Sequence, residues 1–127
     1  METNVAFYQS SRAKFPDLTE RADRQHTKYW GEPSAEEQDS YSWFESASRA
    51  LNNEMQRGTY VNECQAFFQF VENVYRTGSE EVKKCIDVAF VENLFWRVSP
   101  KKVGPYWQVL PKILQDLYVD FHARSPL

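Results

Sequence analysis

The sequence contains few of the residues that most catalytic and metal sites require. It has two cysteines, Cys64 and Cys85, and two histidines, His26 and His122, and none of these belongs to a CxxC pair or to a set with metal-ligand spacing. Glycine-rich phosphate loops, H-E-x-x-H and G-x-S-x-G are all missing. We therefore expect no catalytic residues, no cofactor and no bound metal, and expect the protein not to be an enzyme.

The cysteines and histidines are expected to play structural roles. Each cysteine lies inside an apolar helical pattern, which predicts a buried, reduced thiol. A nucleophilic Cys64 paired with a histidine is the less favoured alternative, because a thiol on an apolar helix face is normally inert. The two histidines are expected at the surface or at helix ends.

Long apolar runs and an excess of positive charge are also missing. No apolar stretch approaches the roughly 20 residues that span a membrane, and the first residues lack the basic and apolar regions of a signal peptide. These features predict a cytoplasmic protein without membrane contact. The formal net charge of −3 argues against direct nucleic-acid binding, which usually needs a surplus of Lys and Arg.

Glycine is scarce, and its positions indicate where helices end. Three of the four glycines, Gly31, Gly58 and Gly78, lie where predicted helices stop. With 127 residues, 42% of them hydrophobic, the chain predicts a single domain spanning residues 1–127. The predicted fold is all-α: a compact antiparallel bundle of about four main helices plus short N-terminal helices, without a sheet.

The clearest predicted helix covers residues 34–57. Ser34 and Glu37 form an S-x-x-E capping box, and Gly58 follows the last residue. An apolar stripe with one small residue recurs at three- and four-residue spacing, at Tyr41, Phe44, Ser48, Leu51 and Met55.

Two more helices follow between the glycines. Thr59 is the expected cap of a helix that ends at Gly78, and Ser79 is the expected cap of the next. That third helix is apolar over more than half of its circumference up to Trp96, so we expect it at the centre of the bundle.

The ends of the chain are less regular. Residues 99–102 are expected to form a loop around Pro100. The last helical region, 105–121, contains Pro111, which predicts either a kink or a break into two helices. Two short helices are expected before Gly31, joined by a turn at residues 15–18.

One segment is a candidate binding surface. Residues 29–48 carry five carboxylates and no Lys or Arg, interleaved with aromatic residues. Carboxylates can steer a basic partner while exposed aromatic rings anchor it. Trp43 is rotated by about 100° from Phe44, which places it at the edge of the apolar stripe or outside it. The predicted contacts are Trp30, Glu32, Glu36, Glu37, Asp39, Tyr41 and Trp43. Alternatively, the rings belong to the core and the acids to a solvated face.

A second, basic patch is expected to be solvated surface and is the next candidate for a binding face. It consists of Lys83, Lys84, Arg97, Lys101 and Lys102.

Three segments resemble a known family. The stretches FFQFVE at 67–72, TGSEEV at 77–82 and VAFVENL at 88–94 resemble small all-helical bacterial immunity proteins of polymorphic and contact-dependent growth inhibition toxin systems. The segments 15–18 and Gly104-Pro105 are also similar to that group. The resemblance carries no catalytic residues.

The resemblance implies a function. An immunity protein binds a cognate toxin domain and neutralises it by blocking its active site. Many such toxins are nucleases, which are basic because they hold phosphates, and an acidic inhibitor suits a basic partner. Two alternatives remain open: a helical adaptor or regulatory subunit, and a small enzyme with a dispersed site that uses His26, His122 or Cys64.

Overall fold

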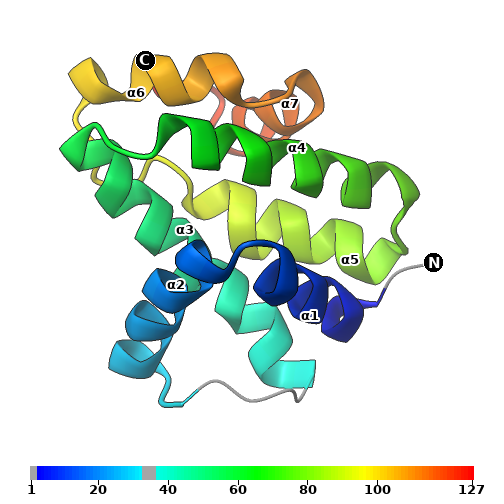
Figure 1. Cartoon of the computed structure of the whole chain (residues 1–127). Helices are drawn as coiled ribbons and strands as arrows, with labels where there is room; N and C mark the ends of the chain where they lie inside the picture. The colour runs from blue at the N-terminus through cyan, green and yellow to red at the C-terminus, as the bar shows by residue number, and fades with distance from the viewer. Residues whose placement is uncertain (1–2, 33–36) are drawn as a thin grey trace.

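The computed structural model describes residues 3–32 and 37–127, and this part of the chain confirms the all-α prediction. It contains no strand, and its helices pack into one bundle (Figure 1). The elements in chain order are α1 (Asn4–Lys14), α2 (Pro16–Tyr29), α3 (Glu37–Arg57), α4 (Val61–Thr77), α5 (Glu80–Lys84), the π-helix η1 (Cys85–Phe90), the 3-10 helix η2 (Val91–Asn93), α6 (Pro100–Val109) and α7 (Lys112–His122).

Helix α3 lies at the centre of the bundle. It packs against α1 and α2 on one side and against η1, η2 and α6 on the other. In Figure 1, α1 and α2 lie at one end of the molecule and α6 and α7 at the other, with α4 and α5 between them. The segment 79–96, predicted to be central, shares that position with α3.

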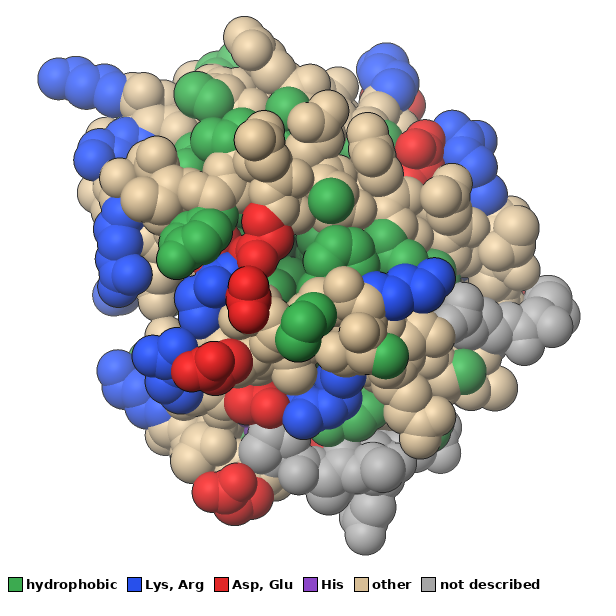
Figure 2. Space-filling view, viewed as in Figure 1, with side chains coloured by type: hydrophobic (Ala, Val, Ile, Leu, Met, Phe, Trp, Pro, Cys, Tyr) green, Lys and Arg blue, Asp and Glu red, His purple; other side chains and the backbone are tan. Residues whose placement is uncertain are grey.

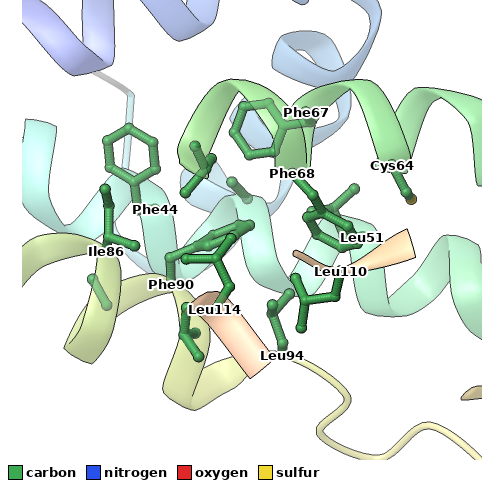
Figure 3. Packing of buried hydrophobic residues seen from close by; sticks show 14 of the residues in the cluster. Phe44, Leu51, Cys64, Phe67, Phe68, Ile86, Phe90, Leu94, Leu110 and Leu114 are labelled. Atoms are coloured by element: carbon green, nitrogen blue, oxygen red, sulfur yellow. The ribbon is translucent and has the colours of Figure 1, made fainter. Parts of the chain in front are cut away.

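The core joins the apolar stripes of the middle elements (Figure 3). Phe90 of η1 lies against two rings of α4, with ring centroids 5.6 Å from Phe67 and 6.3 Å from Phe68. Phe44 and Leu51 of α3 and Leu114 of α7 are also fully buried. The removal of these side chains from water is the main stabilising contribution.

The helix starts differ in part from prediction. Ser79 caps α5 as expected, because its hydroxyl accepts a hydrogen bond from the Val82 N–H at 3.3 Å. Thr59 does not cap α4; its hydroxyl donates to the Glu54 carbonyl at 3.3 Å, and the cap residue is Tyr60 with φ 59°. Ser34 of the predicted capping box lies outside the described residues.

The segment 80–93 is not one regular α-helix. Its turns widen in η1 and tighten in η2, and side chains of α3 bind the backbone groups that this irregularity leaves free. The Ser48 hydroxyl donates to the Phe90 carbonyl at 2.7 Å. The Asn52 amide donates to the Asn93 carbonyl and accepts from the Phe95 N–H, each at 2.8 Å.

Pro100 and Pro111 lie at the starts of helices, whereas Pro105 lies inside α6. Pro100 is the first residue of α6, so the loop expected at 99–102 is wrong; a proline fits the first turn because its missing N–H has no helical partner there. Pro111 precedes α7, which makes a break rather than a kink. Within residues 3–32 and 37–127 no helix combines the length and hydropathy needed to cross a membrane.

Candidate functional site

Trp43 does not lie on the surface, contrary to prediction. Its side chain has no exposed area, its indole N–H donates to Asp23 Oδ1 at 2.8 Å, and its ring meets Tyr8 edge-on at 5.5 Å. The apolar stripe of α3 was expected to mark the whole buried arc, but α1 and α2 cover a second face of the helix. Trp43 therefore joins α3 to these two helices and is not available to a partner.

The other predicted contact residues differ in how far their side chains are exposed to solvent. Trp30 is 53% exposed and Glu32 is exposed, whereas Tyr41 and Asp39 are half-buried. Glu37 is the first residue of α3, and Glu36 lies outside the described residues. Among the predicted contacts whose side chains the structure describes, only Trp30 and Glu32 are clearly exposed.

His26 lies at a helix end, which is one of the two predicted positions, and it is buried there. It lies in the last turn of α2 with no exposed area. Its Nδ1 is 3.0 Å from Ser46 Oγ and its Nε2 is 3.7 Å from Asp39 Oδ1. Ser46 is also fully buried, so this Ser–His–Asp set connects α2 to α3 and presents no nucleophile to solvent.

His122 and Cys64 lie in different surroundings from His26. His122 ends α7, with its Nε2 3.1 Å from the Glu92 carbonyl oxygen and its ring stacked on Tyr118. Cys64 is buried on α4 and lies 3.8 Å from a Glu54 oxygen. Burial raises the pKa of its thiol, which keeps it protonated and inert as predicted. Cys85 is likewise a free, buried thiol.

Two adjacent hollows form a groove beside α3 that the sequence analysis did not predict. Their volumes are about 290 Å³ and 230 Å³, and they meet at Gln25 and Asn53. Guanidinium groups, aromatic rings and carboxamides line them. We call this surface the arginine groove; it consists of Arg21, Arg24, Arg49, Arg57, Arg97, Tyr29, Tyr60, Trp96, Gln25, Asn52, Asn53, Gln56, Ala50 and Glu54.

The arginine groove is positively charged in an acidic protein. Five arginines and one glutamate line it, within a chain of formal net charge −3. Figure 2 shows Lys and Arg side chains along the left edge of the visible face, where α2, the end of α3 and the start of α6 lie in Figure 1. Of the predicted basic patch, only Arg97 belongs to the groove, while the Lys102 ammonium donates to the Gln56 carbonyl beside it at 2.7 Å.

Large aromatic rings stand exposed in the groove. Tyr29 is 57% exposed, Tyr60 52% and Trp96 59%. Tyr60 and Arg97 both have positive φ values, 59° and 58°, which are strained for residues with a side chain. Strained backbone of this kind is concentrated at functional sites in proteins.

A buried ion-pair cluster closes one end of the groove. Arg21 of α2 pairs with Glu54 of α3 and with Glu63 of α4, and its guanidinium lies 4.4 Å from the Tyr60 ring centroid. Glu54 is only 1% exposed. One cation thus faces two carboxylates in a region of low dielectric.

Burial raises the pKa of Glu54 from 4.5 to about 7. Loss of hydration is the main cause; the Arg21 charge opposes it and the Glu63 charge adds to it. The pKa of Glu63 is raised for the same reason. Near neutral pH the cluster therefore holds a proton that these carboxyl groups would release in water.

We expect the stability of the protein to fall as pH rises from 4.5 to 7. In this window the folded state holds the Glu54 proton and the unfolded chain does not, so deprotonation favours unfolding. The free energy of unfolding falls by up to about 3 kcal/mol over this range. Urea unfolding at pH 5 and pH 8 measures it, with Glu54→Gln as the reference because this variant cannot titrate there. If the stability of the wild type and of Glu54→Gln changed with pH in parallel, Glu54 would not be the titrating group.

The sequence contained a weak signal for the groove. The polar side of α3 carries Arg49, Asn52, Asn53 and Gln56 at helical spacing, and α2 carries Arg21 and Arg24 three residues apart. Solvated helix faces usually mix Glu with Lys, so a face of amides and arginines is unusual. Arg97 could not be added from the sequence, because its place depends on the turn after η2.

In the described part of the chain, no group of three or more His, Cys, Asp or Glu side chains is placed to hold a metal ion.

The comparisons with known proteins identify one family. Residues 8–124 match a family described as a domain of unknown function, DUF7674. The chain belongs to the DUF7674 family. No curated protein and no solved structure is detectably similar to it. The DUF7674 match includes every residue of the arginine groove.

Proposed function

We propose that this DUF7674 domain is an immunity protein, which acts in the cytoplasm by binding a cognate bacterial toxin domain and blocking its active site. The arginine groove is the observation that carries the proposal. Arg, Tyr and Trp are the residues most enriched in the energetic centres of protein interfaces, and here they surround one hollowed surface. The resemblance of segments 67–72, 77–82 and 88–94 to immunity proteins supports the same function.

The burial of the groups that could act as nucleophile or base favours a binding function over a catalytic one. Ser46 and His26 are fully buried, and Cys64 is a protonated thiol in the core. The groove presents mainly guanidinium, amide and aromatic groups, and its one described carboxyl group, Glu54, is buried in an ion pair with Arg21. Such a surface suits recognition of a second protein.

The groove replaces most of the predicted acidic–aromatic surface as the binding face. Trp43 is buried and Asp39 lies near His26, so neither provides an open contact. Trp30 and Glu32 follow Tyr29, which lines the groove, and they extend the proposed face beyond the end of α2.

Co-expression in a bacterial host tests the function. The gene is expressed with the gene that directly precedes it, which is where the toxin of an immunity protein is expected, and wild-type protein should restore the growth that this toxin stops. The variant Arg49→Glu/Arg97→Glu is expected to lose protection, whereas Arg76→Glu/Arg124→Glu, which makes the same charge change outside the groove, retains it. Failure of wild-type protein to rescue growth, with both proteins soluble, would refute the pairing. Capture of a housekeeping assembly in near-equal amount would then favour an adaptor.

A further inference from the structure

The hollow between α2, α3 and the turn after η2 has a distinct chemistry. It contains two guanidinium groups, Arg49 and Arg97, and two rings, Tyr29 and Trp96; its remaining lining residues are all carboxamides. Among the residues that the structure describes, no carboxylate lines it. The described lining is therefore rich in hydrogen-bond donors and positive charge and holds no anion.

Arg49 and Arg97 are among the four of the protein's eight arginines that form no ion pair in the described part of the chain. Arg12, Arg21, Arg24 and Arg76 each pair with a carboxylate. In the described part of the chain, neither Arg49 nor Arg97 forms an ion pair, and the Nη1 atom of Arg49 is buried without a hydrogen-bond partner. A buried charged donor without an acceptor is costly, and an incoming anion would satisfy it.

The rings hold these two guanidinium groups in place. The Arg49 guanidinium carbon lies 4.7 Å from the Tyr29 ring centroid, and that of Arg97 lies 4.3 Å from the Trp96 centroid. A guanidinium over a ring keeps its N–H edge free to donate. Each ring also has one face occupied, which leaves less of it for the stacking of a nucleic-acid base.

We propose that this hollow binds carboxylate side chains of an acidic segment in the partner protein. The inference rests on the proposed function and identifies the chemistry of the toxin surface that the domain covers. Planar guanidinium groups match carboxylates through paired hydrogen bonds, and the neighbouring amides can donate to the segment's backbone. A nucleic acid would need the cations of the whole groove, but Arg21 and Arg24 already pair with carboxylates and the chain as a whole is acidic.

The proposal opposes the partner charge expected from the sequence. Net charge and the acids of residues 29–48 predicted a basic partner, whereas the groove fits an acidic one. Non-specific attraction would also favour a basic ligand, because the chain carries a formal net charge of −3. Preference for an acidic ligand is therefore diagnostic of the hollow.

Fluorescence anisotropy with three labelled probes tests the proposal. The probes are decaglutamate, decalysine and a ten-residue oligothymidine, titrated with the full chain at low ionic strength. Wild-type protein is expected to prefer decaglutamate. Arg49→Gln and Arg97→Gly are each expected to weaken that binding about tenfold. Because Arg97 has a positive φ, the glycine variant removes the guanidinium while relieving backbone strain, so its urea midpoint is not expected to fall.

Two matched substitutions outside the hollow serve as controls. Arg76→Gln repeats the charge loss on exposed α4 surface, and Ala123→Gly repeats the glycine substitution at φ 59°. Both are expected to bind decaglutamate like wild type. Preference for decalysine or oligothymidine, or unchanged decaglutamate binding in the Arg49 and Arg97 variants, would overturn the inference. Growth rescue by the wild type together with such a result would leave the immunity function standing and reject only the acidic partner.

Discussion

Arg21→Met is expected to lower the free energy of unfolding by about 3–5 kcal/mol at pH 8, because it leaves two carboxylates facing each other without a cation. Glu54 is almost fully buried and cannot regain water, and Glu63 lies on the neighbouring helix. Urea unfolding followed by far-ultraviolet circular dichroism measures the loss.

The same variant should behave differently in acid. At pH 5 Glu54 is protonated in the folded state, since its pKa is raised to about 7, so removal of the Arg21 charge is much less destabilising. Arg24→Met is the matched control: it makes the same change one helical turn later, where the side chain is 69% exposed and pairs with exposed Glu20. We expect it to change stability by less than about 1 kcal/mol. Equal losses in the two variants would mean that the Arg21 ion pairs stabilise the protein no more than an exposed pair does.

Asn52→Ala is expected to lower the free energy of unfolding by about 2–4 kcal/mol, because it leaves the Asn93 carbonyl and the Phe95 N–H without partners. Asn52 is 6% exposed, so water reaches these groups poorly. The amide also spans the bend at which η2 ends and Phe95 adopts a φ of 67°. The variant therefore tests whether α3 holds this turn.

Asn53→Ala is the natural control for this change. Asn53 is the next residue of α3, is exposed and lines the groove. Its replacement is expected to leave stability within about 0.5 kcal/mol of wild type, since alanine also favours the helix. The midpoints of thermal unfolding of Asn52→Ala and Asn53→Ala, measured in the same buffer, compare the two variants. A stable Asn52→Ala protein would show that the turn is held by its own packing.

Two findings concern buried polar residues, and they share one cause. Trp43 was expected at the edge of the apolar stripe or outside it, and His26 at the surface or at a helix end, because polar atoms normally indicate exposure. In the folded chain Asp23 accepts from the Trp43 indole, and Ser46 lies within hydrogen-bonding distance of His26 Nδ1, so these two polar atoms have partners inside the protein. The helices that cover them, α1 and α2, are the elements whose packing was hardest to predict.

The sequence by itself determined the helices and most of their ends. Apolar spacing, the cap at Ser79 and the stops at Gly58 and Gly78 act within a few residues of each other, so they can be read along the chain. Only the tertiary structure decided which polar side chains are buried, why Glu54 retains its proton near neutral pH, and that Arg49 and Arg97 line one hollow. These properties depend on which helices cover a given face and on how much water they displace, and the residues involved are brought together from distant parts of the chain.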